Sequence, residues 1–327
     1  MLLMERNQSV DLVKIIAMIM IVWMHVGFID SLAMCWPFKF VFGLLTPAIP
    51  LFFMVSGYLM QGKMPTYKYV FRKILNILKY VYTFIIISSI VMSAKSGHLP
   101  KWNILYEWFL QRGFYSIFWY LGAMIYIYIY ILAPVVCKII SSSKARVALI
   151  IMLLICTIVV ILNVSINFEQ QYIRQTFRIW TWLFYFMLGA YIKQYGCSKH
   201  ISWFFVLIMM ATAAMFIIPS ITHSSFEYLY GSVVCVLYAY CIFCACLNTD
   251  VRQSKIISAL SSVFLPVYSF HVYFYLLTNM LVKNYVSIDM IPASLQGSIC
   301  FVVVLTVSIV FSLLITRIPY VKNLFKI

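Results

Sequence analysis

Residues 11–30 read DLVKIIAMIMIVWMHVGFID, an apolar stretch long enough to cross a bilayer as a helix. Two of its side chains are costly in hydrocarbon, Lys14 near one end and His25 deep inside. They are eleven positions apart, which on a helix brings both to within roughly 20° of one face and about 16 Å apart along the axis. This stretch therefore predicts a transmembrane helix with a polar stripe, a cation near one membrane surface and an imidazole in the interior.

The composition is that of a polytopic membrane protein. Of 327 residues, 65% are hydrophobic and only 10% are charged, against about 25% charged in soluble domains. Apolar segments of spanning length lie at 12–29, 38–60, 75–93, 116–137, 147–164, 176–192, 201–219, 228–247, 257–281 and 296–316. The sequence predicts an all-α membrane protein with about ten transmembrane helices, forming a single domain over residues 1–327.

Basic residues predict the orientation. If the N-terminus is cytoplasmic, 17 of the 24 Lys and Arg fall on that side of the membrane and 7 on the other, which places both termini in the cytoplasm. The net charge of +16 lies mostly in short loops, so it indicates membrane orientation and not nucleic acid binding. In this orientation His25 and His271 share a depth in the outer half of the membrane. Pro266, five residues before His271, is expected to kink the ninth segment.

The cysteines predict neither disulfides nor a metal site. Most of the nine lie inside apolar segments, where a free cysteine acts as a small buried hydrophobe. The grouping of Cys241, Cys244 and Cys246 is read as helix packing.

Two connections on the outer side mix charged and aromatic residues, at 94–115 and 165–175. Two interpretations are open: an interfacial aromatic belt with solvated charges, or a rim that binds a sugar. For the second, the candidate substrate-binding residues are Trp119, Tyr120, Glu169, Arg174 and Arg178.

Six short motifs follow one another along the apolar segments. They are Lys14 with His25 eleven positions on, FFMVSGYL at 52–59, FRKILNILKY at 71–80, IFWYLGAM at 117–124, FYFMLGAYI at 184–192 and VYSFHVY at 267–273. In this order they resemble the acyltransferase-3 family of integral membrane acyltransferases, and stand-alone O-antigen or polysaccharide O-acetyltransferases among them. The family pattern usually has arginine where this chain has Lys14. Lysine carries a single ammonium group, in place of the planar guanidinium of arginine that can form two parallel hydrogen bonds.

The resemblance implies an activity and partners. It implies acetyl-CoA, or another acyl-CoA, as a cytoplasmic donor, and as acceptor a sugar of a cell-envelope glycan, such as lipopolysaccharide, or its lipid-linked precursor. It implies a multi-pass protein of the bacterial cytoplasmic (inner) membrane. Some family members continue into an extra-membrane esterase-like domain, which is not expected here because the sequence ends at Ile327, soon after the tenth segment. The oligomeric state is not predicted.

Acyl transfer from a thioester to a hydroxyl needs a base, and a partly desolvated neutral imidazole suits that role. The candidate catalytic residues are His25, as general base, and His271, which either polarises the carbonyl, orients the acceptor or bonds to a facing helix. None of the eight carboxylates lies in mid-membrane, which argues against paired-carboxylate catalysis. A covalent route through Ser56 or a buried cysteine stays open.

The candidate donor-binding residues are Lys14, Arg72, Lys73 and Ser56, with the cations holding the CoA phosphates and no metal involved. The general excess of basic residues on the cytoplasmic side of membrane proteins explains the positions of Arg72 and Lys73 as well as CoA binding does. Ser56 and Gly57 suit close helix packing as well as ligand contact. Two other functions remain as alternatives: a proton-coupled transporter or flippase lined by His25, His271 and Lys14, and a b-type haem protein with the two histidines as axial ligands.

Overall fold

The computed structural model describes residues 7–26, 44–96, 102–129, 132–166, 172–221, 230–285 and 293–325. Within these ranges every regular element is a helix, which confirms the predicted all-α class. The chain divides into two compact units, Met1–Val55 with Gly196–Ile318 and Ser56–Tyr195 with Pro319–Ile327. The boundary falls inside α3 (Ala48–Gln61). The predicted single domain over residues 1–327 stays a prediction.

Each of the ten predicted apolar segments contains a helix. Among the described residues, four helices are long and apolar enough to span a membrane on their own: α1 (Gln8–Val26), α4 (Tyr67–Ser96), α8 (Ala145–Ile166) and α15 (Ala293–Ile315). Two bent pairs raise that number to six, α6 (Trp119–Ile129) with α7 (Leu132–Ile140), and α13 (Lys255–Ser262) with α14 (Phe264–Tyr285). The chain is a membrane protein, while the count of ten and the cytoplasmic termini stay predictions.

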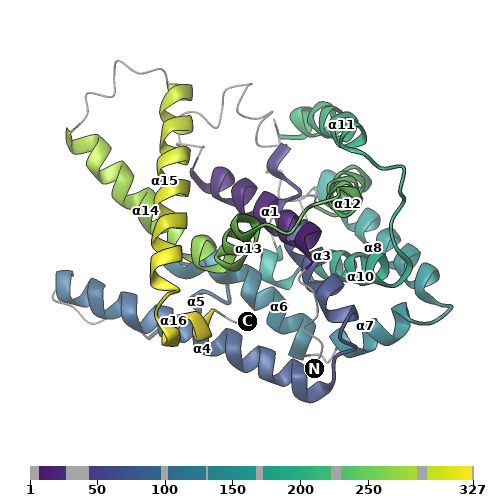
Figure 1. Cartoon of the computed structure of the whole chain (residues 1–327), viewed down its shortest axis with the longest axis horizontal. Coiled ribbons are helices and arrows are strands. Elements are labelled where there is room, and N and C mark those ends of the chain that lie inside the picture. Colours follow the sequence, from purple (N-terminus) through teal and green to yellow (C-terminus); the bar gives the residue numbers. More distant parts are fainter. Residues whose placement is uncertain are drawn as a thin grey trace. The chain divides into compact units, whose positions relative to one another are not determined.

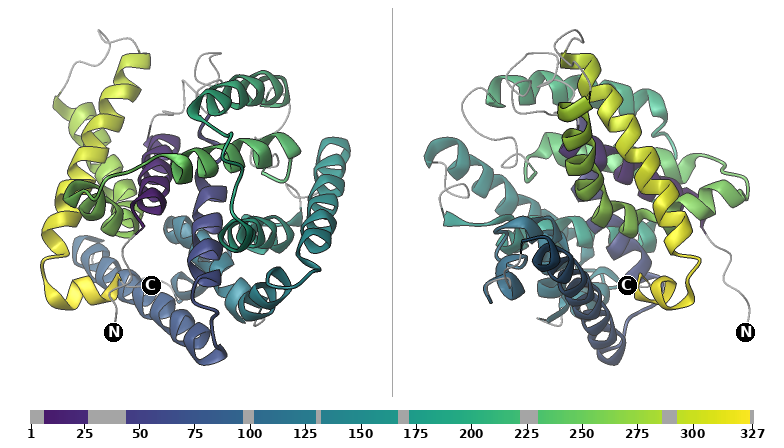
Figure 2. Two further views of the ribbon diagram at one scale, coloured as in Figure 1. Left: turned by 45° about the vertical axis from the view of Figure 1, so that its right-hand side comes forward. Right: turned by 90° about the vertical axis from the view of Figure 1, so that its left-hand side faces the viewer.

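The first unit is built around α1. This helix packs against α12 (Val233–Asn248), α13, α14 and α15, which surround it in Figure 1. Its first turn is capped by Asn7, whose Oδ1 accepts from the backbone N–H of Val10 at 3.1 Å. Apolar residues on all sides of α1 suit this central position, since a helix that is hydrophobic all round is buried. α14 and α15 run beside each other in both views of Figure 2, and α11 (Trp203–Ile221) packs against α12.

A sharp bend separates α13 from α14. The two helices meet at 60°, with Val263 as the residue between them. Pro266 lies in the first turn of α14. Backbone N–H groups in a first turn make no hydrogen bond within the helix, so a proline is tolerated there. The expected break in the ninth segment is therefore present, three residues before the proline.

The second unit packs α10 (Ile179–Tyr195) against α6, α7 and α8, and α4 against α5 (Ile104–Glu107), α6, α7 and α16 (Pro319–Leu324). Two short 3-10 helices precede its aromatic helices, η1 (Phe114–Phe118) before α6 and η2 (Gln175–Phe177) before α10. η2 packs against α6.

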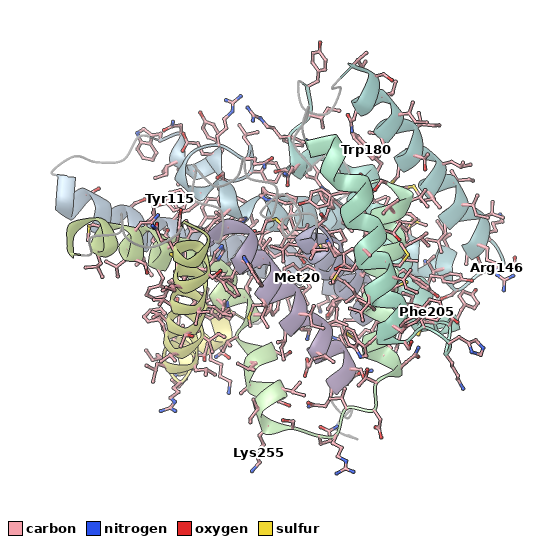
Figure 3. The ribbon with its side chains drawn as sticks, turned by 90° about the horizontal axis from the view of Figure 1, so that it is seen from above. Met20, Tyr115, Arg146, Trp180, Phe205 and Lys255 are labelled. Carbon is pink, nitrogen blue, oxygen red and sulfur yellow. The ribbon has the colours of Figure 1, made fainter. Side chains whose placement is uncertain are left out.

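Lipid contact explains the exposed surface of these helices. α8 exposes a series of aliphatic side chains, among them Ile150, Leu154, Ile158 and Ile161, and such a surface suits hydrocarbon and not water. The basic residues at helix ends point outward, as Figure 3 shows for Arg146 on α8 and Lys255 on α13.

Candidate active site

Two histidines meet inside the first unit. His25 lies in the last turn of α1, and His271 lies in the third turn of α14. The Nδ1 atom of His25 is 2.6 Å from the Nε2 atom of His271, and the rings stack with their centroids 4.9 Å apart at 18°. His271 is fully buried at 0% exposure, whereas His25 is half-buried. Of the two, His25 is the more exposed side chain.

A chain of hydrogen bonds determines where the protons of this pair reside. The Nδ1 atom of His271 lies 3.2 Å from the carbonyl oxygen of Val267, and a carbonyl only accepts, so this nitrogen carries the proton. In a neutral imidazole Nε2 of His271 is then an acceptor, so Nδ1 of His25 donates to it. His25 is left with an unprotonated Nε2, which makes no hydrogen bond with any residue that the structure describes. The arrangement presents a neutral, proton-accepting nitrogen.

The close approach of the two rings bears on the haem alternative. Bound metal ions lie about 2.0 Å from an imidazole nitrogen, so one ion between two ligating nitrogens separates them by about 4 Å. The nitrogens of His25 and His271 are 2.6 Å apart. This geometry does not accommodate iron between them. Among the described residues, no three His, Cys, Asp or Glu side chains are grouped as a metal site requires.

A second polar cluster lies at the other end of α1. The Lys14 Nζ atom is 3.2 Å from Asp11 Oδ1, and Ser261 Oγ donates to the same oxygen at 2.5 Å. Asp11 is only 2% exposed, so its carboxylate depends on these partners. One turn earlier, Gln8 Nε2 donates to Ser258 Oγ at 2.7 Å. These contacts bind α1 to α13, just before the bend that leads to His271.

In this cluster Lys14 is an ion-paired cation. Its ammonium is already paired with a buried carboxylate on the same helix. Asp11 is a residue whose importance the sequence only hinted at, through its position three residues before Lys14. Nothing in the sequence indicated Ser261, 250 positions away.

The motif around Ser56 packs closely in the second unit. A Cβ atom at Gly57 would overlap the backbone carbonyl of Phe186 on α10, so only glycine permits this approach. The Ser56 Oγ atom lies 3.3 Å from the hydroxyl of Tyr120. The FFMVSGYL and FYFMLGAYI motifs thus meet through close packing, and Gly57 has the packing role. Donor contact by Ser56 stays a prediction.

The predicted substrate-binding residues have different environments. Trp119 and Tyr120 begin α6 as expected, but both are buried, and the Trp119 ring lies 5.2 Å from that of Trp182. Arg178 is also buried, and its Nε and Nη2 atoms donate to the carbonyl oxygen of Ile173, both at 3.2 Å. Arg174 is exposed. Glu169 lies outside the described residues.

Two of the candidate donor-binding cations, Arg72 and Lys73, lie on α4. Arg72 is exposed, and Lys73 is half-buried with its Nζ atom 5.6 Å from the centre of the Tyr69 ring. Lys63 Nζ is at the same distance from that ring and donates to its hydroxyl at 3.3 Å. The sequence has no acidic residue from 31 to 106. Two ammonium groups lie near the same aromatic ring, and together they create a positive potential that attracts anions.

Comparison with known proteins agrees with the motif order. The family model for the acyltransferase domain of the acyltransferase-3 family matches residues 7–317. The chain belongs to the acyltransferase-3 family. It is therefore an acyltransferase, and its apolar helices make it an integral membrane enzyme. The matched residues include the helix with Lys14 and His25 and the helix with His271. Neither the curated proteins nor the solved structures that were compared include a match to this chain.

Proposed function

We propose that this membrane acyltransferase moves an acyl group, acetyl in the simplest case, from cytoplasmic acyl-CoA to a hydroxyl of a cell-envelope glycan or its lipid-linked precursor. The observation that carries the proposal is the hydrogen-bond chain from Val267 through His271 to His25, which leaves His25 Nε2 as a base. Its proposed location is the bacterial cytoplasmic membrane, where CoA donors and envelope precursors are both available.

The proposed chemistry needs one proton acceptor that later returns the proton. As the acceptor hydroxyl attacks the thioester carbonyl, its proton passes to His25 Nε2. The oxygen–carbon bond forms, the carbon–sulfur bond breaks, and the CoA thiolate leaves with the electron pair. His25 then returns the proton to the thiolate. While His25 is charged, its Nδ1–H bond to His271 becomes charge-assisted, and such bonds are about twice as strong as neutral ones.

His271 acts in this proposal as a positioning residue. It fixes the tautomer and the ring orientation of His25 and does not itself touch the reacting atoms. This choice among the roles that the sequence left open rests on its complete burial and on its two hydrogen bonds.

The donor is proposed to interact with the basic residues of the cytoplasmic side, Arg72 and Lys73, and with Lys14. CoA phosphates are polyanionic, and Lys63 and Lys73 share the ring of Tyr69 in a stretch without acidic residues. Lys14 contributes less than a free cation, because Asp11 offsets its charge.

The test uses purified protein in nanodiscs made of lipids without sugar headgroups. Radiolabelled acetyl-CoA is supplied with a panel of envelope glycans, and label in the glycan is measured for wild type and for His25→Ala. We expect transfer by wild type and its loss in the variant. In a parallel assay with the protein in sealed proteoliposomes, movement of a glycan across the bilayer without label transfer would favour the transporter alternative. Full transfer by His25→Ala would remove His25 as the base.

A second measurement examines the donor residues. Arg72→Ala and Lys73→Ala are expected to raise the apparent KM for acetyl-CoA more than that for the acceptor. Lys138→Ala, which removes a basic residue in the last turn of α7, is the control. Unchanged donor dependence in both variants would contradict the assignment.

A further inference from the structure

The turn that precedes α10 contains two buried polar atoms without a partner. Gln175 is 4% exposed and Thr176 is 0% exposed. The Oε1 atom of Gln175 and the Oγ1 atom of Thr176 make no hydrogen bond with any described residue. A hydrogen bond left unmade at a buried group destabilises the folded protein. Two adjacent residues with this cost indicate that the turn is completed by a partner beyond the described residues.

The backbone of this turn is held from two sides. The N–H of Gln175 donates to Gln111 Oε1 at 2.8 Å, and the indole N–H of Trp182 donates to the Gln175 carbonyl at 2.6 Å. Gln111 has φ of 53°, an unfavourable value for a residue other than glycine. The turn is therefore preorganised, while its two side-chain oxygens keep their hydrogen-bonding capacity.

The absence of a side chain at Gly122 leaves room for Thr176. A Cβ atom at Gly122, in the IFWYLGAM motif, would lie 3.0 Å from the methyl carbon of Thr176. The glycine thus lets the methyl group pack against α6. The hydroxyl is the polar part of this side chain, and it makes no hydrogen bond within the described structure.

Aromatic rings surround the turn. The ring of Phe177 lies 6.1 Å from that of Phe109 and 5.4 Å from that of Tyr126, and all three are half-buried. Trp180, labelled in Figure 3, is in the first turn of the helix that follows. Aromatic groups beside polar groups suit a ligand with both C–H faces and hydroxyls.

The unpaired atoms restrict the chemistry of that ligand. Gln175 Oε1 only accepts hydrogen bonds, and the hydroxyl of Thr176 both donates and accepts. An ionised phosphate or carboxylate oxygen is itself only an acceptor, so it could not form a hydrogen bond with Gln175 Oε1. A sugar ring provides adjacent O–H groups, each of which donates and accepts.

We propose that Gln175 and Thr176 form a subsite for a hydroxylated sugar ring of the acceptor, an inference that rests on the glycan acceptor proposed above. The subsite gives the turn before α10 a role in acceptor specificity. It also explains why two polar side chains are kept where apolar ones would be more stable.

The test separates sugar binding from acyl transfer. Wild type, Thr176→Val and Gln175→Met are placed in nanodiscs of sugar-free lipid and titrated with methyl glycosides of glucose, galactose, mannose, rhamnose and N-acetylglucosamine. We expect at least one glycoside to raise the Tm of wild type. Because one hydrogen bond contributes about 0.5–1.5 kcal/mol, each variant should bind that glycoside about 3- to 10-fold more weakly.

The control removes a comparable hydroxyl elsewhere. Ser89 on α4 is also buried, and its Oγ atom is also unpaired among the described residues. Ser89→Ala is expected to bind the glycoside as wild type does. Without ligand, Thr176→Val should be at least as stable as wild type, since it replaces an unpaired hydroxyl with a methyl group of similar size.

Three results would overturn the proposal. The first is that no glycoside raises the Tm of wild type, and the second is that wild type and both variants bind the glycoside equally. The third is that Thr176→Val without ligand is less stable than wild type, because the hydroxyl would then have a structural partner or a bound water. The proposed function is judged separately. Label transfer by wild type with glycoside binding unchanged in the variants would retain the acyltransferase reaction and remove only this subsite.

Discussion

The two ends of α1 carry polar pairs of different kinds. Near Gln8 the pair is ionic, with Lys14 and Ser261 both on the carboxylate of Asp11. Near Val26 the pair is neutral, with His25 donating to His271. In the ionic cluster the carboxylate and the ammonium bond to each other, whereas in the imidazole pair the Nε2 atom of His25 keeps a lone pair that can accept a proton. The difference indicates that the first cluster holds α1 in place and that the second performs chemistry.

Replacement of His25 should have the largest effect on activity. His25→Ala removes the proposed base, and general-base catalysis contributes about 10²- to 10⁴-fold to a rate. The kcat for acetyl transfer should fall by that factor, and added imidazole should restore part of it. The Tm should fall as well, because the buried Nε2 of His271 loses its donor. His200→Ala, at an exposed loop position, is the matched control. An equal loss in both variants would refute the special role of the α1 histidine.

Replacement of His271 should have an intermediate effect that depends on the substitute. His271→Leu leaves the Nδ1–H of His25 without its acceptor, a loss of about 1–3 kcal/mol, which corresponds to roughly 5- to 160-fold in kcat. In His271→Gln the amide oxygen can accept the same hydrogen bond, so a substantial part of the activity should return. The KM values for donor and acceptor should change little. Equal activity of the two variants would show that the hydrogen bond does not position His25.

At the ionic end, stability should change more than catalysis. Asp11→Ala leaves Lys14 and Ser261 without their acceptor and should destabilise the protein by about 2–3 kcal/mol. In a double-mutant cycle, Lys14→Met should recover part of that loss, with a coupling of about 0.5–3 kcal/mol. Thermal unfolding of the four proteins measures the coupling. Additive losses would mean that the 3.2 Å contact contributes nothing to stability.

The smallest effect is expected for Ser261→Ala, which removes one donor from Asp11. We expect a loss of about 1 kcal/mol, with kcat within a factor of two or so of wild type, because the imidazole pair is untouched. Ser262→Ala is the neighbouring control, since Ser262 is exposed and, among the described residues, its hydroxyl bonds only the carbonyl of Ala259 in its own helix. A larger loss of kcat than of stability in Ser261→Ala would show that the two ends of α1 are coupled.

Local patterns made part of this site predictable. The spacing of Lys14 and His25 and the depth of His271 follow from helix geometry and hydropathy, which involve only neighbouring residues. The break near Pro266 was also predictable, because proline cannot donate a helical hydrogen bond. Trp119 and Tyr120 lie near the start of the predicted segment 116–137 and begin α6, but their burial was not visible in the sequence.

By itself, the sequence determined the all-α membrane class, the order of the motifs and the family. Apolar segments and their periodicity are properties of short stretches, so no tertiary information was needed. Only the tertiary structure decided that His25 donates to a residue 246 positions away, that Asp11 already neutralises Lys14, and that Gln175 and Thr176 are buried without partners. The reason is physical: the proton positions of a histidine pair and the availability of a charge depend on which side chains folding brings within hydrogen-bonding distance.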